Sequence, residues 1–502
     1  MARAKNSVSA VSNYTVSYNA NGGTGAPAAQ TKTHGVNLTL SSTKPTRTGY
    51  TFLGWATSST ATTPAYKPGA SFSIDANTEL FAVWKAHILT IKYKTGGAVI
   101  GNSKYSADEN GILSHQHSFK YGESLGTSGL IDVNSSFFDL SKDGYWLPTK
   151  NEWHVVGSTM TFDQAYNYPA AKLAELAGCD LKTGNATITL TPNWKPYKLT
   201  IRYKTGGAVI GNSKYTADEN GILSYYQEIE YGQSLGTSGL IDVNSSFFNL
   251  SKAGYWLPAK NEWRVDGGTM SFDQAYDYPA AKMAELAGYD LKTSNVTITL
   301  TPKWKPYMLT IQYKTGGAVI GNSKYTADGN GLLSYYKQFE YGKSIGSRGL
   351  VDVDGAEFNL SKTGYHLTAE NEWRAVNNNN TLDQSYPFTS ETVARLAGFD
   401  LEIGDVTVVL TPHWKINTYT VSYNANGGSK APALQTKTHG QNLVISSTIP
   451  IKENDVFMGW ATSPDMKKPE YSAESVFTLN EDTVLFAVWK SNQIGVYDIK
   501  AT

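Results

Sequence analysis

Three copies of the tripeptide Asn-Glu-Trp carry the residue types of this chain that are best suited to binding chemistry. An aromatic ring beside an amide and a carboxylate is typical of sugar-binding sites, because the ring stacks on the sugar while the polar groups bond its hydroxyls. The alternative is that Trp fills a core while Asn and Glu cap a turn. The candidate glycan or ligand contacts are Asn151, Glu152, Trp153, Asn261, Glu262, Trp263, Asn371, Glu372 and Trp373.

The only cysteine is Cys179, which excludes an internal disulfide and argues against a metal–thiolate site. The equivalent positions in the other copies are Tyr289 and Phe399. We therefore predict a bulky residue that fills the core after a helix, and no nucleophile.

A His-x-His pair, His115 and His117, would place two rings on one face of a strand, as metal ligands require. No third ligand is visible, and the other copies carry Tyr225 with Gln227 and Tyr335 with Lys337. Chemistry that each copy needs should recur in each copy. We expect no catalytic residue, no metal and no cofactor.

The acidic turn at residues 218–221, Asp-Glu-Asn-Gly, resembles the start of a calcium loop. Its glycine comes too early for an EF-hand and no bidentate Glu follows at the required place, so a hairpin turn is favoured over weak calcium binding. A glycan-active enzyme would need a carboxylate pair in a cleft. Only one carboxylate recurs obviously, as Glu152, Glu262 and Glu372.

The elements that position these residues are organised as repeats. YKTGGAVIGNSKY begins at Tyr93, Tyr203 and Tyr313, while YTVSYNANGG begins at Tyr14 and Tyr419. Self-similarity at a fixed period indicates an array of modules and not one large domain. The predicted modules are 14–85, 89–195, 199–305, 309–415 and 419–490.

Within the modules, alternating large and small residues and Gly/Asn turns predict β-strands. The dipeptide Asn110-Gly111 favours a type I′ hairpin turn. Residues 169–178, PAAKLAELAG, predict one helix per central module, with Leu173, Leu176 and Ala177 on the sheet, since two turns do not stand alone. The expected fold is mostly β, α+β in the central modules, arranged as a tandem-repeat rod of five modules.

The two terminal units resemble the Listeria–Bacteroides repeat, or internalin B-repeat. The pattern is a Tyr-containing strand, Asn-Gly-Gly, Pro-x-Arg-x-Gly-Tyr-x-Phe-x-Gly-Trp and a final Leu-aromatic-Ala-x-Trp. It is carried here by Tyr18, 21–23, Pro45, Arg47, Gly49, Tyr50, Phe52, Gly54, Trp55 and 80–84, and by Tyr423, 426–428, Pro450, Phe457, Gly459, Trp460 and 485–489. The last unit departs from it, with Lys452 for the arginine and Asn454-Asp455 for Gly-Tyr.

The three central units look like enlarged relatives that lack the Gly-Trp step and add a hairpin and a helix. The resemblance implies a β-grasp-like fold, and a stalk or adhesive module of bacterial surface proteins or of phage virions in place of an enzyme. Trp is a core residue of this family, which favours the core interpretation of Asn-Glu-Trp over sugar binding.

The composition excludes some classes of binding partner. Lys+Arg and Asp+Glu both number 43, so no basic field attracts nucleic acid or anionic lipid. Neither a secretory signal nor a segment for membrane insertion is visible. We expect a non-catalytic protein on the virion surface, a head or tail decoration or fibre of a phage. It would contact other virion or surface proteins and host cell-wall glycan. A homo-oligomer is a further expectation. The alternative is a Gram-positive cell-surface adhesin stalk.

Overall fold

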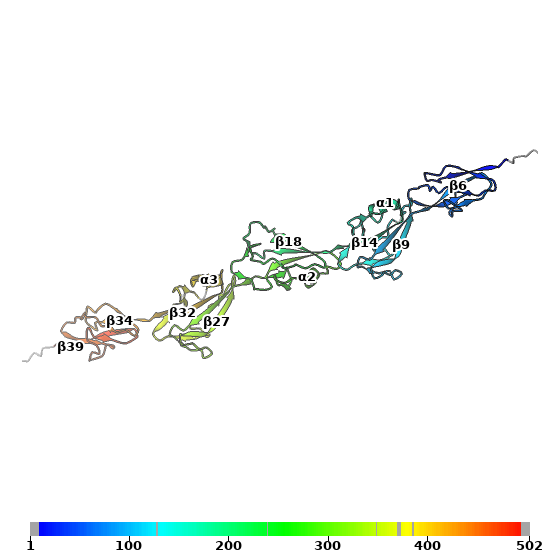
Figure 1. Cartoon of the computed structure of the whole chain (residues 1–502). Coiled ribbons are helices and arrows are strands. Elements are labelled where there is room, and N and C mark those ends of the chain that lie inside the picture. The colour runs from blue at the N-terminus through cyan, green and yellow to red at the C-terminus, as the bar shows by residue number, and fades with distance from the viewer. Residues whose placement is uncertain are drawn as a thin grey trace, which may run out of the picture. The chain divides into compact units, whose positions relative to one another are not determined.

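A computed structural model describes residues 10–126, 129–237, 239–347, 349–368, 373–383 and 386–492 of the chain. The chain is a tandem-repeat β protein whose sheets succeed one another along the sequence (Figure 1). Its residues fall into two compact units, 1–204 with 218–241 and 264–301, and the remainder. Among the described residues, no helix is both long and apolar enough to cross a membrane.

The first module is a four-stranded sheet of order β2-β1-β6-β4 with a separate β3–β5 pair. Its strands are β1 Asn13–Asn19, β2 Gln30–Thr33, β3 Leu38–Thr39, β4 Tyr50–Ala56, β5 Ser71–Phe72 and β6 Thr78–Ala86. Alternation in β1 buries Val16 and Tyr18 beside Trp55, which confirms the predicted strand. Strand β2 was not predicted from the sequence, because Gln-Thr-Lys-Thr carries no apolar residue.

The second module is a five-stranded sheet of order β13-β12-β14-β7-β9. Its elements are β7 Ile88–Lys94, β8 Val99–Ile100, β9 Ile112–Lys120, β10 Leu140–Ser141, β11 Tyr145–Trp146, β12 Trp153–Val155, β13 Thr161–Phe162, α1 Ala170–Leu176, β14 Ala186–Pro192 and β15 Lys195–Pro196. Helix α1 confirms the prediction: Pro169 precedes it, Leu173 is fully buried, and Leu176 and Ala177 pack against the core.

The hairpin turn before β9 is present, but its predicted type is wrong. The Gly111 N–H donates to the Asp108 carbonyl at 2.9 Å, so the turn closes one residue earlier than a type I′ turn centred on Asn110-Gly111. Only Gly111 of that pair has a positive φ, +72°. The Asp108 carboxylate accepts bonds from the Asn110 and Ile112 N–H groups, and this side-chain bonding selects the turn.

The third and fourth modules repeat the second. The third contains β16 Lys198–Lys204, β17 Val209–Ile210, β18 Ile222–Glu230, β19 Leu250–Ser251, β20 Tyr255–Trp256, β21 Trp263–Val265, β22 Ser271–Phe272, α2 Ala280–Leu286, β23 Val296–Pro302 and β24 Lys305–Pro306. The fourth contains β25 Met308–Lys314, β26 Val319–Ile320, β27 Leu332–Glu340, β28 Leu360–Ser361, β29 Tyr365–Leu367, β30 Trp373–Ala375, β31 Thr381–Leu382, α3 Ser390–Leu396, β32 Val406–Pro412 and β33 Trp414–Ile416.

The fifth module returns to the four-stranded form, with order β35-β34-β39-β37 and a β36–β38 pair. Its strands are β34 Thr418–Asn424, β35 Gln435–Thr438, β36 Leu443–Val444, β37 Asp455–Ala461, β38 Val476–Phe477 and β39 Thr483–Ser491. The sequence departure at Asn454 leaves the fold unchanged, since β37 still pairs with β39 along its length.

One aromatic pair unites the small and the enlarged modules. The Tyr18 and Trp55 ring centroids lie 4.8 Å apart in the first module, and those of Tyr93 and Trp153 lie 5.0 Å apart in the second. The single strand β4 corresponds to the two short strands β11 and β12, which pair with β15 and β14. The tryptophan of the Gly-Trp step is therefore retained in the enlarged modules, displaced by an insertion that splits the strand.

Candidate functional site

The predicted Asn-Glu-Trp residues lie at the start of β12, where they serve the fold. The Trp153 side chain is fully buried and its indole N–H donates to the Ile131 carbonyl at 2.6 Å. The buried Glu152 carboxylate accepts the Val133 N–H at 3.0 Å. Burial raises the pKa of Glu152, and the Val133 bond partly opposes this shift. The exposed Asn151 has a φ of +61°, so it forms the turn.

The other two copies follow the same pattern as far as they are described. Trp263 and Trp373 are fully buried, Glu262 accepts the Val243 N–H at 3.0 Å, and Asn261 has a φ of +59°. Asn371 and Glu372 lie outside the described residues. Glycan contact at this motif stays a prediction, although the buried rings have no open face on which a sugar could stack.

Cys179 and its equivalents do not share one environment. Cys179 and Phe399 are half-buried against the cores of their modules, whereas Tyr289 is 51% exposed. The position therefore tolerates a solvated ring as well as a packed side chain.

The His115 and His117 rings meet edge to face, with centroids 4.8 Å apart and an angle of 82° between their planes. The His117 Nδ1 lies 3.2 Å from the Tyr93 hydroxyl. The pKa of both imidazoles is lowered, chiefly by burial. Repulsion from Lys104 lowers the pKa of His115 further, and repulsion between the two rings when both are protonated lowers that of His117. No group of three His, Cys, Asp or Glu side chains suited to a metal exists in the described part of the chain.

Two buried lysines in the terminal modules differ in their partners. The Lys32 Nζ lies 2.5 Å from the Asp75 carboxylate, whereas the Lys437 Nζ donates to Asn480 Oδ1 at 3.0 Å. Each lysine is 1% exposed. A buried lysine beside an asparagine is the pair of residues from which an isopeptide bond can form, but that reaction also needs a neighbouring carboxylate. Lys437 forms no ion pair with any described residue.

Consecutive modules meet at a recurring junction, which the sequence did not predict. Between the first and second modules, the Gly49 N–H donates to the Lys182 carbonyl at 3.0 Å, and the Gly49 carbonyl accepts the His87 N–H at 2.9 Å. The Tyr121 ring covers Gly49 so closely that a Cβ there would lie 2.2 Å from it. The buried His87 joins both sides, since Nδ1 lies 2.9 Å from the Leu181 carbonyl and Nε2 lies 3.0 Å from Thr51 Oγ1.

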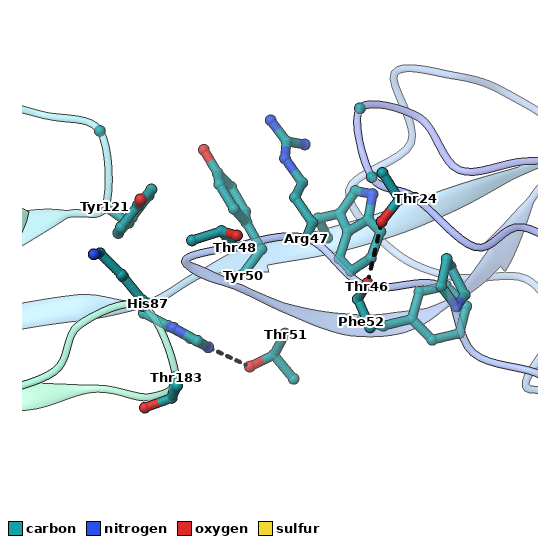
Figure 2. Close-up of a pocket in the computed structure, with 16 residues that line it drawn as sticks. Thr24, Thr46, Arg47, Thr48, Tyr50, Thr51, Phe52, His87, Tyr121 and Thr183 are labelled. Atoms are coloured by element: carbon teal, nitrogen blue, oxygen red, sulfur yellow. Dashed lines mark hydrogen bonds between the residues drawn. The ribbon is translucent and has the colours of Figure 1, made fainter.

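A cavity of about 760 Å³ opens beside this junction, and Figure 2 shows its lining side chains. The Arg47 guanidinium lies 3.9 Å from the centre of the Tyr50 ring, which in turn meets the edge of Tyr121. Trp84 and Lys182 also line the cavity. Cations, aromatic faces and a Gly-rich loop are thereby gathered at one groove.

The junction recurs at the other module boundaries. Glycine and overlying ring are Gly144 with Tyr231, Gly254 with Tyr341 and Gly364 with His439. A lysine replaces the arginine over the next tyrosine, with Nζ-to-ring distances of 4.2 to 4.5 Å for Lys142–Tyr145, Lys252–Tyr255 and Lys362–Tyr365. The repeated Gly-Tyr dipeptide was the signal in the sequence, but its ring partner lies in the next module.

The cavity at the junction between the third and fourth modules is lined by the residue types best suited to binding a sugar. This cavity of about 870 Å³ is bounded by Trp256, Trp304, Asn249, Glu262 and Glu402, among others. Trp256 is 39% exposed, and its counterpart Trp146 is 41% exposed. The open aromatic faces therefore belong to strands β11 and β20, and the tryptophans of Asn-Glu-Trp are the buried ones.

Comparison with known families agrees with the small modules. The Listeria-Bacteroides repeat domain matches residues 14–83 and 419–488. Both terminal modules are Listeria–Bacteroides repeats. The matched ranges contain the four-stranded sheets apart from the first residue of β1 and of β34 and the last residues of β6 and β39, and the enlarged modules lie between them.

Two curated relatives come from Evansella cellulosilytica. A "Putative Gly-rich membrane protein" is 22% identical over 470 residues, 90% of this chain and 40% of the relative. A "Putative membrane protein" is 28% identical over 109 residues, 22% of this chain and 16% of the relative. The chain thus spans less than half of either relative. Among solved structures, the Bacillus anthracis TIE protein matches with 11% identity and a TM-score of 0.22, covering 67% of this chain and 52% of that one.

Proposed function

We propose that this chain is a non-catalytic structural and binding protein exposed outside the cell. The observation that carries the proposal is how the repeated residues are used. Residues that recur in the modules fill cores, form turns or join neighbouring modules, as Trp153, Asn151 and Gly144 do. Residues with reactive side chains, such as Cys179 and His115, occur in one copy only. If a catalytic unit had been duplicated, its reactive side chains would recur in every copy.

For the placement of the chain we propose a virion accessory protein, a head or tail decoration or fibre. Near-identity of the second and third modules fits a spacer whose length changes by duplication, and the repeat family occurs in phage structural proteins as well as on cells. A bacterial surface stalk is the second candidate. The names of the two Evansella relatives, both putative membrane proteins, favour it.

Quantitative proteomics on the producing culture separates the two placements. Density-purified phage particles are compared with washed cell envelopes and with the cytosolic fraction. Enrichment in the particles at fixed stoichiometry supports the virion protein. Enrichment in the envelope fraction, within a longer polypeptide, supports the stalk and overturns the virion placement. Enrichment in the cytosol overturns both.

We propose that the surface at the module junctions binds cell-wall glycan. Trp146 and Trp256 offer half-exposed indole faces, and the cavity at the junction of the third and fourth modules adds the amide of Asn249 and the carboxylates of Glu262 and Glu402. Pull-down on purified Gram-positive peptidoglycan tests it. The full chain should bind, and the Trp146→Ala/Trp256→Ala variant should lose most of the binding. Equal retention of both proteins, or none of either, contradicts a glycan role for this surface. The exposed Tyr166→Ala serves as control.

A further inference from the structure

All five modules place their first strand beside, and parallel to, a long strand near their C-terminal end. The pairs are β1 with β6, β7 with β14, β16 with β23, β25 with β32 and β34 with β39. In the second module the register runs from Leu89 opposite Ala186 to Tyr93 opposite Leu190. The strand that enters a module is therefore bonded directly to this long strand. It leaves the terminal modules itself, and in the central modules it leads into the short strands β15, β24 and β33.

This arrangement determines how a module responds to tension on its two ends. In a parallel pair, the start of the entering strand and the end of the leaving strand lie at opposite ends of the shared ladder. Pulling them apart makes the strands slide, and all ladder hydrogen bonds must break together. An antiparallel pair pulled from its open end, such as Ile88 and Lys120 in β7 and β9, loses its bonds one after another.

The boundaries between modules pass tension on without slack. Strand β6 ends at Ala86 and β7 begins at Ile88, while β33 ends at Ile416 and β34 begins at Thr418. The residue between them is itself bonded, since the His87 N–H donates to the Gly49 carbonyl and the Asn417 N–H to the Gly364 carbonyl. At these two boundaries the linking residue is held by a backbone hydrogen bond, so little chain can extend before the strand pairs are loaded.

We propose that each module is a mechanical clamp loaded in shear, and that the chain bears tension between whatever holds its two ends. The biological purpose rests on the proposed role outside the cell, but the mechanical behaviour is a property of the isolated chain. The two proposals can therefore fail separately.

The clamps differ in strength. The parallel register spans four residue pairs in the first and fifth modules and five in the central ones. The cores behind the strands differ as well, with seven buried apolar residues in the core cluster of the first module and nineteen in that of the second. Under rising force, the two terminal modules should therefore open before the three central ones.

Single-molecule force spectroscopy on the full chain, held at both ends, tests the order. Cys179→Tyr removes the native thiol and introduces the residue type present at position 289. We expect two early events, each releasing up to roughly 240 Å, then three releasing up to roughly 360 Å, at about 3.4 Å per extended residue. Central modules that open first, or a single gradual extension without separate events, contradict the proposal.

A change of pulling direction tests the clamp itself. In the full Cys179→Tyr chain, handles at Ile88→Cys and Lys195→Cys load the second module in shear, whereas handles at Ile88→Cys and Lys120→Cys open the β7–β9 pair from its end. Rupture should need at least about two-fold less force in the second geometry, because its bonds break singly. Equal forces overturn the proposal. Met308→Cys with Glu340→Cys or Lys415→Cys repeats the comparison in the fourth module, should a second-module variant not fold.

Discussion

The terminal and central modules build their cores around the same kind of Tyr–Trp pair, but the central modules surround it with more residues. Each small module closes its core around one Tyr–Trp pair, Tyr18 with Trp55 or Tyr423 with Trp460. The enlarged modules retain that pair and add the helix and the loops that follow β9, which brings Leu130, Val133 and Phe138 into the core. The insertion therefore increases the core at the cost of a continuous strand, since β4 becomes β11 and β12.

The difference teaches where the stability of each module type should reside. A core of seven buried apolar residues has little else to rely on when its central indole is removed. A core of nineteen distributes the same loss over more contacts. The stability of a small module should depend strongly on single core residues and on contacts with the adjacent module. The stability of a large module should depend on them less.

Removing the central tryptophan gives the largest expected effect. Trp55→Ala and Trp153→Ala each delete a fully buried indole, which costs about 3–5 kcal/mol. We expect the first module to unfold and the second to survive with lower stability, since a domain has about 5–15 kcal/mol in total and the small core has less. Peptide-resolved hydrogen exchange measures each module separately. Unfolding of the second module with survival of the first would reverse the comparison.

The junction glycine gives the next largest effect. Gly49→Ala strains a residue with a φ of +82° and pushes a Cβ against Tyr121. We expect a loss of about 2–4 kcal/mol in the first module, from left-handed strain of about 1–2 kcal/mol and overpacking. Gly69→Ala is the matched control, with a φ of +76° and nothing within 4 Å of its Cβ. Equal losses in chemical denaturation of the two variants would mean that the junction adds nothing to the small module.

Acid should distinguish the second module from the third. Burial lowers the pKa of His115 and His117, so the folded module binds fewer protons than the unfolded chain. The stability contributed by these neutral rings is present above pH 6.5, the ordinary histidine value, and is lost as the pH falls below it. Hydrogen exchange at pH 7 and 5 should show the second module weakening more than the third.

The variant His115→Tyr/His117→Gln is the control for this titration, because it installs the residues of the third module, Tyr225 and Gln227. It should reduce the pH dependence specific to the second module and leave the part due to His154, whose pKa burial also lowers and whose counterpart in the third module is Arg264. Persistence of the full dependence would assign it to other groups.

The sequence predicted the repeats, the strands of the frame and helix α1, because each depends on local spacing. It did not predict the junction, in which Tyr121 covers Gly49, because those residues come from different modules and no local pattern links them. The Asn-Glu-Trp motif shows the same limit. A buried and an exposed tryptophan have the same letter, and only the strand register assigns Trp153 to the core and Trp146 to the surface.

The smallest expected effect concerns the hydroxyl of the core tyrosine. In the first, third and fifth modules a glutamine accepts the bond from this hydroxyl, as in Tyr18–Gln30, Tyr203–Gln227 and Tyr423–Gln435. The fourth module has Lys337 at that position, and the buried Tyr313 hydroxyl has no hydrogen-bond partner. Burial also lowers the pKa of Lys337, so the charged amine is unfavourable there.

Lys337→Gln should therefore stabilise the fourth module by about 1 kcal/mol, since it supplies an acceptor and removes a poorly solvated cation. The reverse exchange, Gln227→Lys, should weaken the third module by a similar amount. Denaturant midpoints assigned to each module by hydrogen exchange compare the two. Opposite signs would show that the enlarged modules still depend on the polar detail that the small ones share. A loss in both variants would mean that the fourth module has adapted its packing to the lysine stem.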